Sequence, residues 1–87
     1  MLMQSLFPTK PFKIQYKNTI LDIIPLDIEG RYGFQITFSG SRKPLVVVRA
    51  TAINNEKFWT SMPEGRQREA EGVGELIEQY IREHPVE

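Results

Sequence analysis

The chain contains no cysteine and a single histidine, His84, among its 87 residues. The absence of cysteine excludes disulfides, thiolate catalysis and cysteine-ligated zinc, and it favours a reducing compartment such as the cytoplasm. The single histidine stands next to a proline near the end of the chain, and no nucleophile that it could activate is evident nearby. One histidine without any cysteine also makes a zinc site very unlikely. We therefore predict a protein that is not an enzyme and that holds no metal or cofactor.

Long apolar runs and excess charge are also missing. No stretch approaches the ~20 apolar residues of a membrane helix, and the N-terminus lacks the pattern of a signal peptide. The net charge is zero, but residues 1–60 hold eight basic and four acidic side chains (+4), whereas residues 61–87 hold three and seven (−4). We expect a soluble, cytoplasmic protein without a membrane partner, basic in its first part and acidic in its last.

The length predicts one small domain. A chain of 87 residues buries only roughly 60–65% of its unfolded surface, so that a homodimer, which buries more, is a reasonable expectation. Residues 1–11, with two prolines, are predicted to be a loosely ordered tail. Residues 12–84 are predicted to form a single α+β domain, and residues 85–87 a C-terminal tail.

The first 60 residues carry strand patterns. Two segments alternate apolar and polar side chains, which predicts strands with one buried and one wet face. Two other segments have apolar residues at both odd and even positions. Pro25, which lacks an N–H, predicts a bend or an edge in one of them. Whether the short last strand pairs beside its neighbour stays open. The predicted strands are residues 12–17, 20–28, 32–38, 45–50 and 57–60.

The acidic end of the chain carries a helical pattern from Arg66 to Glu83. Ser61 and Glu64 have the spacing of a capping box, which predicts Ser61 as the N-cap. A start at Glu64 or Gly65 stays open, because a residue that precedes proline disfavours helical geometry. The apolar stripe of this helix comprises Ala70, Val73, Gly74, Leu76, Ile77, Tyr80 and Ile81.

Strands followed by a helix predict an α+β fold, with an antiparallel four- to five-stranded meander sheet packed on one face by a single C-terminal α-helix. This order of elements is similar, at fold level only, to Pur-type and Whirly-type single-strand binders. The predicted core joins the helix stripe to Tyr16, Phe34, Ile36, Phe38, Val46, Val48 and one of Phe58 and Trp59.

Basic side chains fall on strand positions opposite this predicted core. If the helix covers one face, they gather on the other, either as a merely solvated face or as a platform for phosphate groups. Exposed aromatic rings there would stack on bases or anchor a protein partner. The candidate partner or nucleic-acid surface comprises Lys13, Lys17, Arg42, Lys43, Arg49, Tyr32 and Trp59.

Two functions follow from these patterns. The first is a non-enzymatic interaction domain, homodimeric, that binds a protein or acts in regulation; it rests on the missing catalytic residues, the small core and the adjacent large aromatics. The alternative is single-stranded nucleic-acid binding through a basic sheet face. The open face of the sheet distinguishes them: a basic, concave face favours nucleic acid, and a flat apolar face favours protein.

Overall fold

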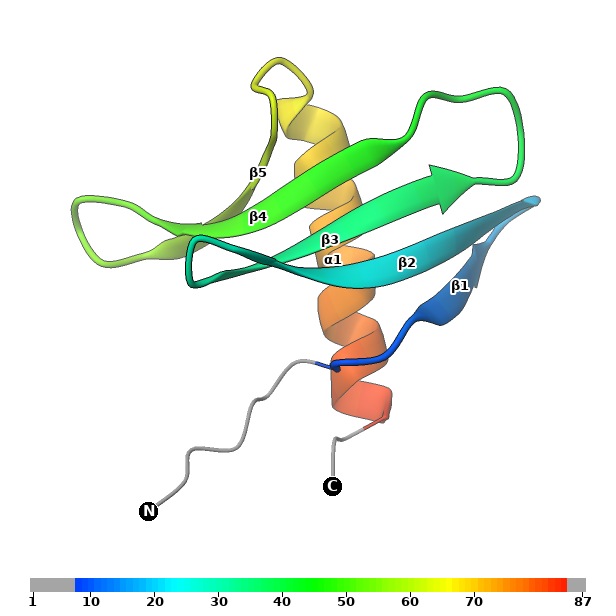
Figure 1. Ribbon diagram of the computed structural model, residues 1–87, viewed down its shortest axis with the longest axis horizontal. Coiled ribbons are helices and arrows are strands. Elements are labelled where there is room, and N and C mark those ends of the chain that lie inside the picture. The colour runs from blue at the N-terminus through cyan, green and yellow to red at the C-terminus, as the bar shows by residue number, and fades with distance from the viewer. Residues whose placement is uncertain (1–7, 85–87) are drawn as a thin grey trace.

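The computed structural model describes residues 8–84, which form a five-stranded antiparallel sheet and one α-helix (Figure 1). The strands lie across the sheet in chain order, so the last strand pairs beside its hairpin neighbour. This confirms the predicted meander with a C-terminal helix, although most of the two predicted tails falls outside the described residues. The elements are β1 (Phe12–Tyr16), β2 (Thr19–Ile28), β3 (Arg31–Phe38), β4 (Leu45–Thr51), β5 (Lys57–Ser61) and α1 (Gln67–Glu83).

Tight turns set the register of the first three strands. Between β2 and β3, Glu29 and Gly30 both have positive φ, 54° and 81°, as in the turns that match the twist of a hairpin. The Gly30 N–H donates to Asp27 Oδ1 at 2.9 Å, which stabilises this turn. Because side chains alternate between the two faces of a strand, this register fixes the face on which each residue of β2 and β3 lies.

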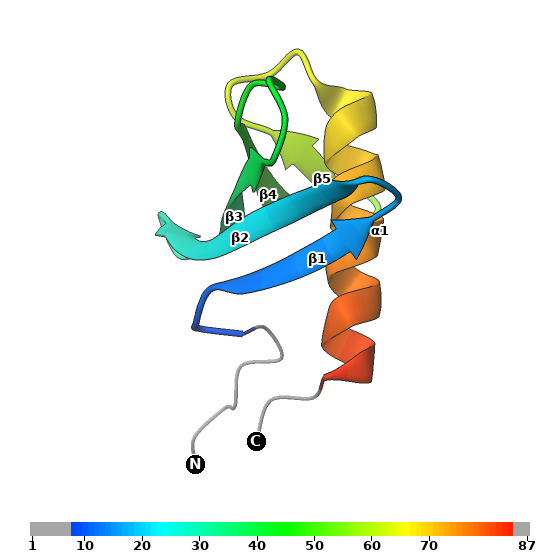
Figure 2. The ribbon, with the colours of Figure 1, turned by 90° about the vertical axis from the view of Figure 1, so that its right-hand side faces the viewer.

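The molecule has two layers. Helix α1 lies along one side of the sheet, against β5, β4 and β1, and no element of the described chain covers the other side (Figure 2). The helix carries an apolar stripe every three to four residues, and this stripe closes the core. The core comprises Leu21, Ile23, Phe34, Ile36, Phe38, Leu45, Val47 and Trp59 from the sheet, with Ala70, Val73 and Ile77 from α1.

The predicted facing of β4 is wrong. Leu45 and Val47 pack toward the helix, whereas Val46 and Val48, the predicted core residues, point to the other side of the sheet. The run Leu45–Val48 is apolar at every position, so its sequence contains no alternation that fixes which face is which. The pairing of Val47 with Phe34 in β3 decides it.

The predicted N-cap is also wrong. Ser61 ends β5, and the helix begins at Gln67 after Gly65, whose φ of +124° is incompatible with a helix. The Ser61 hydroxyl still accepts a hydrogen bond from the Arg66 N–H at 3.1 Å. Ser61 thus accepts a hydrogen bond from an N–H at the helix start, although it is five residues from that N–H and is not the N-cap.

Candidate interaction surface

The sheet side opposite α1 is mainly apolar, not basic. Cross-strand pairs place side chains of β2, β3, β4 and β5 on it in rows: Ile24 beside Gln35, and Gln35 beside Val46. We call this side the open sheet face. Its apolar members are Ile20, Ile24, Leu26, Ile28, Val46, Val48, Ala50 and Phe58.

Large side chains on this face are substantially exposed. Ile20 and Ile24 are each 41% exposed and Phe58 40%, and Met62, directly beyond β5, is 46% exposed. Single exposed apolar side chains are ordinary, but Ile24 and Phe58 are joined across the sheet by the apolar Leu26, Val48 and Ala50. The open sheet face is therefore a partly exposed apolar surface.

Close packing within the face makes it smooth. Gly33 lies beside Val48 in the next strand, and a Cβ on Gly33 would meet Ile28 Cδ1 at 2.7 Å. The Ile28 side chain thus folds over the glycine, and Val48 is fully buried although no helix covers it. This part of the face is a closed apolar layer.

The charges on the open sheet face are few and partly cancelled. Lys13 Nζ and Asp22 Oδ1 form an ion pair across β1 and β2 at 2.7 Å. Arg31 stands at the far end of β3, where it is exposed. The face is therefore close to neutral, which removes most of the electrostatic attraction that a phosphate backbone needs.

Arg49 and Trp59, two of the predicted surface residues, lie on the helix side. Trp59 is only 5% exposed, so its predicted place on an exposed partner surface is wrong; Phe58 is the exposed member of that pair. Trp59 Nε1 donates to Glu78 Oε2 at 2.7 Å, and Arg49 pairs with the same oxygen. Arg49 also lies 5.1 Å from the Trp59 ring, so these three residues join β4 and β5 to α1.

Arg42 also lies on the helix side, paired with Glu69 of α1 at 3.0 Å and stacked over Phe38 at 4.3 Å. Arg66 makes the stronger contact with Glu69: its Nε and Nη2 donate to the two carboxylate oxygens at 2.9 and 2.8 Å. Together they lower the pKa of Glu69 from 4.5 to about 2, with the Arg66 hydrogen bond as the main cause and Arg42 adding to it. The same contact raises the pKa of Arg66.

The remaining predicted residues are scattered. Lys17 lies in the β1–β2 turn, 5.3 Å from the Tyr16 ring, and Lys43 lies in the β3–β4 loop, where its carbonyl accepts from Arg66. Tyr32 shares the helix-facing alternation of β3 but stands near the strand end, 43% exposed. Of the seven candidates, only Lys13 lies on the open sheet face, so the structure does not gather them into one basic platform.

The sequence patterns did not predict the apolar residues of this face, Ile20, Ile24 and Phe58, as site residues. A signal was present: residues 20–28 and 45–50 are apolar at both alternations, so each strand has apolar side chains on two faces. A single helix covers one of those faces and leaves the second row uncovered. Strands with two apolar faces and a chain with one helix therefore predict an uncovered apolar surface.

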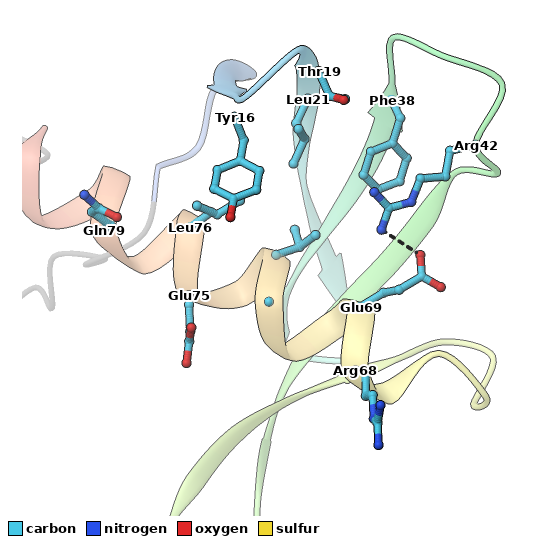
Figure 3. A pocket seen from close by; sticks show the side chains of 12 residues that line it. Tyr16, Thr19, Leu21, Phe38, Arg42, Arg68, Glu69, Glu75, Leu76 and Gln79 are labelled. Atoms are coloured by element: carbon cyan, nitrogen blue, oxygen red, sulfur yellow. Dashed lines mark hydrogen bonds and ion pairs between the residues drawn. The ribbon is translucent and has the colours of Figure 1, made fainter.

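A groove separates the β1–β2 hairpin from α1 (Figure 3). Its volume is about 470 Å³, and it is lined by Tyr16, Leu21 and Phe38 from the strands and by Leu76 from the helix. The Arg42–Glu69 ion pair closes one end, whereas Arg68 and Glu75 point away from the groove. With an apolar floor and its nearest charges already paired, it offers room for an apolar side chain.

Within residues 8–84, no group of three or more metal-ligating side chains is present. None of the helices there is long and apolar enough to cross a bilayer. No protein family, curated protein or solved structure matches this chain.

Proposed function

We propose that this protein is a small non-enzymatic interaction domain that self-associates through the open sheet face, forming a homodimer with a protein-binding or regulatory role. The observation that carries the proposal is the set of exposed apolar side chains on a sheet face without a covering layer, with Ile20 and Ile24 on β2 and Phe58 on β5. The lack of cysteine supports a role in a reducing compartment such as the cytoplasm.

The size of the face suits a second copy of the chain. Five strands spaced about 4.8 Å apart, the longest with 10 residues and β4 with 7, give a face of roughly 20 by 25 Å. Its roughly 500 Å² in projection is comparable with the ~800 Å² of accessible surface that each partner buries in a standard interface. Stacking two such faces at about 10 Å would give four layers, with the helices outside.

The chemistry of the face is self-complementary. A two-fold interface brings the same patch together twice, so it tolerates neutral and bifunctional groups better than charges of one sign. Gln35, half-buried between Ile24 and Val46, carries both a donor and an acceptor and can pair with its own symmetry mate. The Lys13–Asp22 pair is likewise electrically balanced.

Single-stranded nucleic-acid binding through this same face has less in its favour. Arg42 and Arg49 are paired with helix carboxylates, and Trp59 is buried in the core. The open sheet face thus lacks the cations and the ring on which that alternative depended.

Sedimentation-equilibrium ultracentrifugation tests the proposal. The wild-type protein is expected to sediment as a dimer of about 20 kDa, twice the chain mass of 10.1 kDa, at tens of micromolar. Ile24→Lys places a charge at the centre of the face and is expected to shift the protein to the monomer, with unchanged far-ultraviolet circular dichroism. The desolvation of that charge in an interface is the cause.

Ile53→Lys is the matched control, because Ile53 is fully exposed in the turn after β4 and lies off the open sheet face. It makes the same chemical change and is expected to leave the dimer intact. A wild-type monomer at several hundred micromolar, or equal loss of the dimer in both variants, contradicts the proposal.

A further inference from the structure

The groove between the β1–β2 hairpin and α1 lies on the helix side of the sheet, away from the open sheet face (Figure 3). Its strand residues Tyr16, Leu21 and Phe38 belong to the alternation that faces α1. Ile20 and Ile24 belong to the opposite alternation, so a dimer formed through the open sheet face leaves the groove accessible. Its volume of about 470 Å³ lies in the range of small-ligand pockets.

One end of the groove carries a positive charge that is not fully compensated. Arg66 holds both carboxylate oxygens of Glu69: Nε donates to Oε2 at 2.9 Å and Nη2 to Oε1 at 2.8 Å. Arg42 Nη2 donates a further hydrogen bond to Oε1 at 3.0 Å. Two positive charges against one negative charge leave this end with a net charge of +1. Among the described residues that line the groove, the other carboxylate is Glu75, which points away (Figure 3).

Arg42 is held where an anion in the groove can reach it. Its guanidinium lies 4.3 Å from the centre of the Phe38 ring, which forms part of the groove wall. Only one of its five N–H donors is taken by Glu69, and its side chain is half exposed. The guanidinium fork therefore has the capacity to bind a second carboxylate from the side of the groove.

Gly72 opens the helix wall of the groove. It lies exposed within α1, where glycine is less favourable than any residue except proline. No atom lies within 4 Å of the place that a Cβ would occupy, so packing does not explain this glycine, in contrast to Gly74 beside Trp59. Glycine is the residue that lets a ligand approach a backbone closely. A ligand in the groove can therefore lie directly on the helix at this position.

The geometry points to a binding site for a small organic carboxylate with an apolar body, such as a medium-chain fatty acid. The carboxylate accepts hydrogen bonds from Arg42 at the charged end of the groove. The apolar body lies against Tyr16 and Leu76, the partly exposed apolar side chains that line the groove, and over the gap at Gly72. A short anion would gain no contact with this apolar lining, and an uncharged apolar molecule would gain nothing from the guanidinium.

Titration of the uniformly ¹⁵N-labelled protein at neutral pH tests this inference, with amide shifts as the readout. The probes are octanoate, 1-octanol and acetate. Octanoate is expected to give saturable shifts at residues 16–21, 38–42 and 69–79, octanol to bind about tenfold more weakly, and acetate to cause no shift. The same result is expected in Ile24→Lys, so a failure of self-association leaves this test intact.

Arg42→Gln is expected to weaken octanoate binding about tenfold and to leave octanol binding unchanged, because only the carboxylate uses the guanidinium. Arg68→Gln is the matched control: Arg68 lines the same groove but points away from it, so this variant is expected to bind like the wild type (Figure 3).

Gly72→Leu places a side chain in the groove and is expected to weaken both octanoate and octanol at least about tenfold. Leucine also favours the helix, so this loss of binding is expected without a loss of stability in urea unfolding. Absent or non-saturable shifts, shifts confined to the open sheet face, or equal weakening in Arg42→Gln and Arg68→Gln overturn the inference.

Discussion

At the scale of single residues, the contact between Gly74 and Trp59 decides how closely the helix approaches the sheet. The indole ring lies where a side chain at position 74 would begin, and both residues are buried. This approach brings Trp59 Nε1 to the Glu78 carboxylate one turn further along α1. Packing against Trp59 therefore explains why position 74 is a glycine, although glycine lowers helix propensity.

Two glycines of α1 provide a matched pair of substitutions. Gly74→Ala is expected to destabilise the fold by about 2 kcal/mol, because the new Cβ would overlap the Trp59 ring and force overpacking. Gly72→Ala is expected to stabilise it by about 0.5–1 kcal/mol, since no atom lies within 4 Å of that position and alanine favours the helix. Urea unfolding measures both; equal effects would show that the ring contact has no energetic weight.

At the scale of elements, Arg66 joins the start of α1 to the β3–β4 loop. Its guanidinium donates to the carbonyls of Pro44 at 2.6 Å and Lys43 at 3.1 Å while it holds Glu69. Its own N–H is bound by Ser61 at the end of β5. One side chain thus holds a loop, a strand end and a helix together without a side-chain cap on α1.

This contact predicts an acid-dependent loss of stability. The pKa of Glu69 in the folded protein, about 2, is below its usual 4.5, so its stabilisation is complete above 4.5 and disappears as pH falls through about 2. At neutral pH, Glu69→Gln is expected to lower the unfolding free energy by about 1 kcal/mol, a value discounted for solvent exposure. The deficit relative to the wild type should vanish near pH 2.

Chemical denaturation at a series of pH values measures this effect. Arg66→Gln combined with Glu69→Gln serves as the control, because the glutamine at position 69 should add little once the guanidinium is gone. A Glu69→Gln deficit that stays constant from neutral to acidic pH would show that the ion pair does not stabilise the fold.

At the scale of the whole molecule, the fold is thin: its principal extents are 43, 31 and 19 Å. One sheet and one helix account for the short dimension, and the described chain supplies no third layer (Figure 2). A sheet with apolar side chains on both faces is ordinarily covered on both. The proposed dimer supplies the missing cover.

Self-association makes thermal stability depend on protein concentration. The melting temperature of the wild type is expected to rise by several degrees over a hundredfold increase in concentration, because the dimer forms only from folded chains. The monomeric Ile24→Lys variant should melt at one temperature throughout. Differential scanning calorimetry measures both, and a concentration-independent wild type would argue against a dimer linked to folding.

The element order and most of the helix stripe could be predicted from local patterns: the alternation in residues 12–17 and 32–38 and the 3.6-residue period after Gln67. The tight turn at Gly30 is likewise a local feature, because glycine adopts a positive φ without strain. These features depend on neighbours along the chain, so a sequence pattern is enough to find them.

The face that an ambiguous strand turns to the helix depends instead on contacts between distant segments. Residues 45–48 are all apolar, and their facing depends on cross-strand pairing with β3, which no local pattern encodes. That one choice moved Arg49 to the helix side, where Glu78 binds it, and left Val46 and Val48 on the open sheet face. Charge pairing and burial arise between segments distant in sequence, so the character of the candidate surface became visible only once the chain was folded.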